Sequence, residues 1–240
     1  MKDEELSDPP PPSAERVARR AIVLSVISCR GIVESDNANP TNAAGLAKRS
    51  RDWLHAIGLE EELSDWERDV LASPFGSLSE RDRINASWLS EAVTILAWSL
   101  GKLELPGLED QCDPERSASS LGFLKPVGAT ALNGPQLRAP NILQEYNEFI
   151  YHVHWRIRDF SLIERPYDFE SIARKAWGEP ILRHGLQINE KDLCVDGVPI
   201  FSAPEDKRCT LASITQERHR ASNWLIGYGS EDFYEVTTDT

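Results

Sequence analysis

The sequence predicts a mainly α-helical protein: a single helical domain of about six or seven helices with one small β-hairpin near the C-terminal end. Three observations predict this class. Apolar residues recur every three or four positions along several segments, as they do on one face of a helix. These segments begin at residues that cap helices and end at glycine or proline. One later stretch, LCVDGVPIF, instead places Asp-Gly between β-branched runs, which is typical of a type I′ hairpin.

Helix-capping residues divide the chain into elements. Residues 1–12 are acidic and end in four prolines. We expect this leading segment to be disordered, because it has too little apolar surface to offset the entropy lost on ordering. Ser64 and Glu67 have the spacing of a capping box, and Ser77 and Glu80 repeat it. The N-caps predicted in chain order are Ser13, Thr41, Ser64, Ser77, Asp168 and Ser202. The expected helices span residues 13–33, 41–58, 64–73, 80–100, 141–161, 168–177 and 203–227.

The helix expected at 80–100 has the widest apolar surface. At 100° per residue its apolar side chains cover roughly 220° of the circumference, whereas a surface helix has a narrower stripe. We therefore expect the central, mostly buried helix here. The apolar positions are Ile84, Trp88, Leu89, Ala92, Val93, Ile95, Leu96, Ala97 and Leu100. Helix 141–161 differs, because its apolar residues fall within roughly 100° of arc and predict an amphipathic helix.

Two further segments complete the predicted domain, which spans residues 13–240. Residues 102–139 are rich in Pro, Gly and Ser without sustained periodicity, and we expect a long loop or insertion. Residues 190–201 hold the hairpin. Pro199 places this hairpin at a sheet edge, because proline cannot donate a ladder hydrogen bond.

Charge and cysteine content argue against several classes of protein. The 240 residues include 39 Asp and Glu against 26 Lys and Arg, and the net charge of −13 repels the phosphate backbone of a nucleic acid. No basic and apolar leader opens the chain, and no apolar run approaches the roughly 18 residues of a membrane span. We therefore expect a cytoplasmic protein with no membrane contact. The four cysteines lack zinc-ligand spacing, and without an export signal we expect them to be reduced thiols. We expect no cofactor.

Two histidines in the segment YHVHW raise the question of a metal site. On a helix His152 and His154 point about 200° apart, so their rings cannot share one ion. We interpret them as solvated or hydrogen-bonded surface histidines and predict no metal site. Nucleotide-binding, zinc-protease and serine-hydrolase signatures are absent from the sequence.

The last predicted helix carries the sharpest anomaly. Glu217 projects into its apolar arc beside Trp224, and Arg218 lies at the other side of that arc. His219 faces away from it. A carboxylate on a buried stripe costs free energy unless it is paired. Two interpretations stay open: an ion pair that fixes the packing of the helix, or a carboxyl of raised pKa that acts as an acid or base in a cleft.

Several segments of the chain together resemble a known family. They are RAIVLSVISCRG, WERDVLASPFG, SWLSEAVTILAWSLG and HWRIRD, followed by the helix ERHRASNWL and the ending TDT. In this order they resemble the bacterial Domain of Unknown Function 4272 family, whose helix motif usually reads ERHxALNWL. Ser222 stands where that motif has leucine. The resemblance implies one α-rich unit and implies no reaction, cofactor or partner.

We expect a non-catalytic accessory protein whose acidic surface meets a protein partner. The alternative is an enzyme of unrecognised type, with a site built from the C-terminal helix, the tail and helix 141–161. Its candidate catalytic residues are Glu217, His219, His154, Asp159 and Asp239, and its candidate binding residues are Arg218, Trp224, Trp155 and Arg158. An enzyme needs such side chains to converge on a pocket that solvent reaches. The ending TTDT is either a free tail or a cap on the body, and a hydrogen-bonded Asp239 favours the cap.

Overall fold

The computed structural model describes residues 8–35, 39–125, 129–176 and 185–240. Its backbone packing divides the chain into two compact units. The N-terminal unit comprises residues 13–106 and 111–138, and the C-terminal unit comprises residues 107–110 and 139–240 with the described part of 1–12. The single domain over 13–240 stays a prediction.

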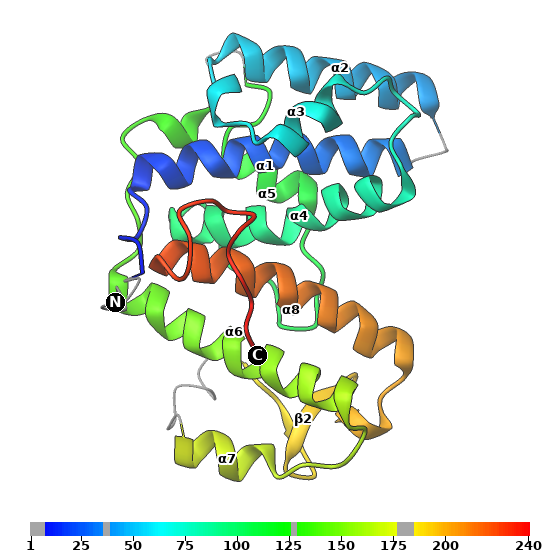
Figure 1. Ribbon diagram of the computed structural model, residues 1–240, viewed down its shortest axis with the longest axis vertical. Helices are drawn as coiled ribbons and strands as arrows, with labels where there is room; N and C mark the ends of the chain where they lie inside the picture. The colour runs from blue at the N-terminus through cyan, green and yellow to red at the C-terminus, as the bar shows by residue number, and fades with distance from the viewer. Residues whose placement is uncertain (1–7, 36–38, 126–128, 177–184) are drawn as a thin grey trace, which may run out of the picture. The chain divides into compact units, whose positions relative to one another are not determined.

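The N-terminal unit packs its helices around α1 (Figure 1). Its helices are α1 (Ala14–Ser35), α2 (Pro40–Ala56), α3 (Asp65–Ala72), α4 (Glu80–Ser99) and α5 (Pro114–Ser120). Helix α1 lies between α2 and α4, and its apolar stripe, including Val17, Leu24 and Ile27, is fully buried. Gly31 lets α1 approach α4 closely, because a Cβ atom there would lie 2.8 Å from the Cβ of Ala86.

The prediction of a mostly buried helix at 80–100 is confirmed by α4. Every residue from 89 to 99 is buried, which is what a wide apolar arc requires. The expectation for Ile84 is wrong, since its side chain is 46% exposed. The first turns of α4 are open to solvent, so an apolar residue there does not reach the core.

The C-terminal unit is built on two long helices that lie side by side (Figure 1). They are α6 (Pro140–Leu162) and α8 (Glu205–Ile226). Between them in sequence come the short helix α7 (Phe169–Ala176) and the strands β1 (Ile188–Asn189), β2 (Asp192–Val195) and β3 (Val198–Pro199). The protein is therefore mainly α-helical, as predicted. Throughout the described ranges, no helix combines the length and apolarity that crossing a membrane would require.

The predicted hairpin is confirmed. Val195 pairs with Val198 in the antiparallel β2–β3 ladder. The two residues between them, Asp196 and Gly197, have φ values of 54° and 79°, and a type I′ turn needs positive φ at both positions. Strand β1 adds to the other side of β2, so the sheet has the order β1-β2-β3 and β3 with Pro199 is an edge strand.

Several helix starts differ from the predicted caps. The Ser64–Glu67 capping box is present at α3. Helix α2 is instead capped by Asn39, because Pro40 with its fixed φ takes the first helical position. Ser79 rather than Ser77 caps α4, and Pro204 rather than Ser202 precedes α8 without a side-chain cap. Asp168 accepts a hydrogen bond from the Ser171 amide at the start of α7, as predicted.

Two segments predicted to lack regular structure contain some order. Within 102–139, Asp113 caps the short helix α5, with Pro114 at its first position. Residues 1–7 of the expected disordered lead lie outside the described residues. The rest of that lead, 8–12, packs on the end of α8, where the amide of Gly229 donates to a carboxylate oxygen of Asp8 at 3.1 Å.

Candidate functional site

Two of the candidate histidines meet between α6 and α8. His154 lies on α6 and His219 on α8, and their Nδ1 atoms are 3.0 Å apart. The ring of Tyr151 stands edge-on to that of His219, with centroids 5.6 Å apart. Together with His152, whose ring also contacts Tyr151, these residues form what we call the histidine cluster. Sequence spacing could not show this pairing, since the two histidines are 65 positions apart.

The interpretation of His152 and His154 as surface histidines is wrong. Both are buried, with 4% and 3% of their surface exposed, and α8 covers the His154 side of α6. Burial lowers the pKa of His152 to about 4, and burial together with the nearby Arg158 lowers that of His154 to about 4. Burial and then the neighbouring His154 lower the pKa of His219 to about 3. The rings are therefore neutral at pH 7, and one Nδ1–H donates to the other Nδ1.

The C-terminal segment, residues 228–240, folds back over α8 (Figure 1). Asn223 connects three parts of the unit: its Oδ1 accepts from Asn147 of α6 at 2.7 Å, and its Nδ2 donates to the carbonyl of Thr237 at 2.9 Å. Asp239 accepts hydrogen bonds from the hydroxyls of Thr237 at 2.8 Å and Tyr228 at 3.5 Å. A hydrogen-bonded Asp239 favours the interpretation of this ending as a cap on the body.

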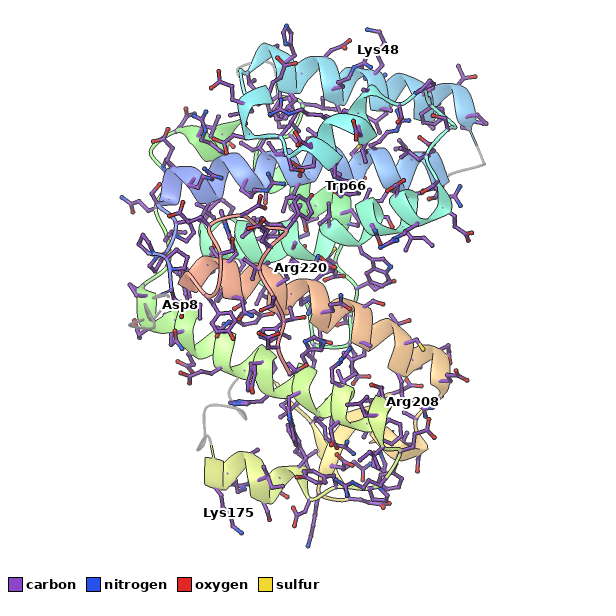
Figure 2. The ribbon with its side chains drawn as sticks, viewed as in Figure 1. Asp8, Lys48, Trp66, Lys175, Arg208 and Arg220 are labelled. Carbon is purple, nitrogen blue, oxygen red and sulfur yellow. The ribbon has the colours of Figure 1, made fainter. Side chains whose placement is uncertain are left out.

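Glu217 is held by an ion pair on its own helix. Arg220 projects from α8 (Figure 2), and its Nη1 lies 3.0 Å from both carboxylate oxygens of Glu217. This favours the first of the two interpretations, a paired carboxylate. The adjacent Arg218 is 2% exposed and donates to the carbonyls of Gly107 and Asp110, so it ties the 107–110 segment to α8.

A second polar cluster, missed by the sequence analysis, surrounds Arg156 on α6. Its guanidinium makes two parallel 2.7 Å hydrogen bonds to the carboxylate of Asp192 on β2, and both side chains are fully buried. Arg156 also pairs with Asp159 at 3.0 Å, and the ring of Trp155 contacts Tyr167 nearby. Helical spacing could have indicated that Arg156 is buried. It lies three positions after Val153 and four before Phe160, which are both buried residues of the α6 apolar stripe.

The candidates therefore separate into distinct groups. His154, His219 and Asp239 lie where α6, α8 and the C-terminal segment meet, and the negative charge of Asp239 acts on the His219 ring. Asp159 and Trp155 belong to the cluster around Arg156. Arg158 is exposed, and the indole of Trp224 donates to the Glu231 carbonyl at 3.0 Å. Among the described residues, no group of three or more His, Cys, Asp or Glu side chains is placed to hold a metal ion.

Comparison with known proteins adds one positive finding. The family model described as "Domain of unknown function (DUF4272)" matches residues 4–170. This chain belongs to the DUF4272 family. The match covers most of the chain, including the α1, α3, α4 and α6 segments that resemble the family, whereas α8 and the TDT ending of this DUF4272 chain lie beyond it. No curated protein and no solved structure shows significant similarity to the chain.

Proposed function

We propose that this DUF4272 chain is a non-catalytic accessory protein that binds a basic protein partner through the acidic surface of residues 228–240. The observation that carries the proposal is that the candidate catalytic groups are engaged in internal hydrogen bonds. Glu217 is paired with Arg220, Asp159 with Arg156, and Asp239 holds two hydroxyls of its own segment. Polar groups used in this way stabilise the helix or segment to which they belong.

The histidine cluster is poorly suited to acid–base catalysis. A general acid or base works best when its pKa lies near the working pH. The pKa values of about 4 for His154 and about 3 for His219 lie well below neutrality. Neither ring carries the second proton of an imidazolium at pH 7, so neither is a general acid there, and each is a weak base. This supports a structural role for the pair.

Residues 228–240 present negative charge on a fixed backbone. The segment YGSEDFYEVTTDT contains four carboxylates, at Glu231, Asp232, Glu235 and Asp239, and no Lys or Arg. All four side chains are exposed, whereas Phe233 and Val236 are buried and anchor the segment. An anchored surface of one sign attracts a partner of the opposite sign and loses little entropy on binding.

We place this function in the cytoplasm. Cys29, Cys112, Cys194 and Cys209 are all free thiols. Thiols that stay reduced fit a reducing compartment, where glutathione and thioredoxin prevent disulfide formation.

The test is a pull-down with the full chain from cells that express it, at ~50 mM and ~300 mM salt, followed by titration with the purified partner. We expect a basic partner that is retained at low salt and released at high salt. Glu231→Gln combined with Glu235→Gln should weaken binding about tenfold. The matched control is Glu164→Gln combined with Glu190→Gln, which neutralises two exposed carboxylates of the same unit outside the segment. Absence of a salt-sensitive partner, or equal effects of the two double variants, would overturn the proposal.

A second candidate function is an enzyme whose site surrounds His219. The observation that favours it is the meeting of His154, His219 and Tyr151, with the negative charge of the exposed Asp239 acting on the His219 ring. A turnover detected in a substrate screen and abolished by His219→Asn, in a variant that unfolds at the same urea concentration as the unsubstituted chain, would establish it.

A further inference from the structure

The N-terminal unit contains two adjoining cavities, of about 220 Å³ and 360 Å³. Both are lined by Arg51, Leu71 and Ala72, so we treat them as one feature, the α2–α3 groove. It lies in a different unit from the histidine cluster and from the acidic segment 228–240. An inference about this groove is therefore independent of the proposed function.

Cations line the groove, although the chain as a whole is acidic. The smaller cavity is lined by three cations, Arg30, Lys48 and Arg51, and by no carboxylate. The larger cavity adds Arg68 and one acid, Glu60. Two carboxylates, Glu34 and Asp52, lie beside the three cations of the smaller cavity, so the cations are in excess there in a chain of net charge −13.

Arg30 is the fixed part of this site. Its side chain is 7% exposed, pairs with Glu34 at 2.6 Å and donates to the carbonyls of Ser73 and Pro74. The guanidinium also lies over the ring of Phe75, 5.3 Å from its centroid. Arg30 Nε, in contrast, is a buried donor without a hydrogen-bond partner among the described residues. A buried donor of this kind costs free energy until an acceptor is supplied.

Lys48 and Arg51 supply the mobile part of the charge. Lys48 projects from α2 (Figure 2), and both side chains are about half exposed or more. They share a single carboxylate: Lys48 hydrogen-bonds to Asp52, and Arg51 lies 3.6 Å from it. Two cations beside one carboxylate leave a net positive charge at the mouth of the cavity.

The rest of the groove is apolar. Small side chains of α2, Ala44 and Ala47, leave room opposite Leu71 and Phe75. Leu54 and Leu63 continue this surface in the second cavity. A ligand that matches both parts has an anionic head and a short apolar body.

We propose that the α2–α3 groove binds a small amphiphilic anion, a carboxylate or phosphate monoester with a short aliphatic or aromatic body. The head would lie among Arg30, Lys48 and Arg51, where arginine and phosphate or carboxylate geometries match. The body would lie along Leu71 and Phe75.

Isothermal titration calorimetry of the full chain tests this proposal with octanoate, octyl phosphate, octanol and inorganic phosphate. We expect a single saturable site for octanoate or octyl phosphate. Octanol lacks the anionic head and inorganic phosphate lacks the apolar body, so each should bind at least about tenfold more weakly. The two anionic probes also show which head the groove prefers.

Variants locate the binding in the groove. Lys48→Ala and Arg51→Ala remove exposed cations and should each weaken binding about tenfold. Ala44→Leu fills the apolar part and should abolish it, while Arg81→Ala, an exposed cation of the same unit that does not line either cavity, should change nothing. Absence of saturable binding, or binding unaffected by these variants, would refute the proposal. So would an acidic peptide that binds with the same variant dependence when octanoate does not, because the groove would then dock a protein.

Discussion

The buried histidines show how a single residue is altered by its surroundings. His154 and His219 would be half charged near pH 6.5 in water, but desolvation keeps both neutral in the fold. Their mutual Nδ1 contact excludes protonation of both rings at once, because two protonated rings would have no acceptor between them. The same burial that weakens them as catalysts makes them sensitive to acid.

Stability should therefore fall as the pH is lowered from 7 to 5. The folded pKa values of about 4 for His152 and His154 and about 3 for His219 are below the ordinary value of 6.5. Below pH 6.5 these histidines become protonated in the unfolded chain but stay neutral in the folded chain. Stability is thus fully present above about pH 6.5 and is lost as the pH falls towards the folded values, by roughly 2 kcal/mol per buried histidine between pH 7 and pH 5.

Urea unfolding of two variants at both pH values checks this prediction. His154→Gln should reduce the loss of unfolding free energy, because one of the three buried rings no longer titrates. His55→Gln removes an exposed ring on α2 and should not reduce the loss. Parallel behaviour of His154→Gln and the unsubstituted chain would contradict the assignment.

At the scale of elements, short-range signals place helices well and their ends less well. The capping box of Ser64 forms as predicted, but the start of α4 moves from Ser77 to Ser79, which directly precedes the first helical residue and accepts a hydrogen bond from the Asp82 amide. Alternative caps two residues apart differ by a few tenths of a kcal/mol to about 1 kcal/mol. Packing of the helix therefore decides between them.

The end of α8 gives a test of element packing through two glycines. Gly227 and Gly229 both have a φ of 79°, so alanine is strained at either position by roughly 1 kcal/mol. Only at Gly227 would the new Cβ also meet another segment, 2.4 Å from the carbonyl oxygen of Pro9 and 2.9 Å from the nitrogen of Pro11, whereas Gly229 faces open space.

We expect Gly227→Ala to be more destabilising than Gly229→Ala by at least about 1 kcal/mol, since it must also displace residues 9–11. Urea unfolding of the two variants measures the difference. Limited proteolysis should show faster cleavage in the first residues of Gly227→Ala alone. Equal free energies of unfolding would mean that residues 9–11 do not pack on α8 in solution.

At the scale of the whole molecule, the net charge of −13 is the dominant electrostatic feature. Charge of one sign destabilises a compact chain by self-repulsion, and salt screens that repulsion. Many ion pairs at the surface, such as Arg174–Glu170, are exposed and contribute little. Repulsion should therefore outweigh attraction in the salt dependence of stability.

The expected result is a rise in the urea concentration at the unfolding midpoint when NaCl is raised from ~20 mM to ~300 mM. The combined Glu231→Gln and Glu235→Gln variant has a smaller net charge and should show a smaller rise. A midpoint that falls with salt would indicate that ion pairs, rather than self-repulsion, control the electrostatics of the fold.

The sequence by itself determined the helical class, the type I′ hairpin, the buried α4 helix and the acidic character, because each depends on neighbours within a few positions or on composition alone. Tertiary structure alone decided what the candidate residues do. The pairing of His154 with His219 joins residues 65 positions apart, and that of Arg156 with Asp192 joins residues 36 apart. Helical periodicity indicates which way a side chain points. It does not indicate which element covers it, and the covering element set the burial, the charge state and the partner of each of these groups.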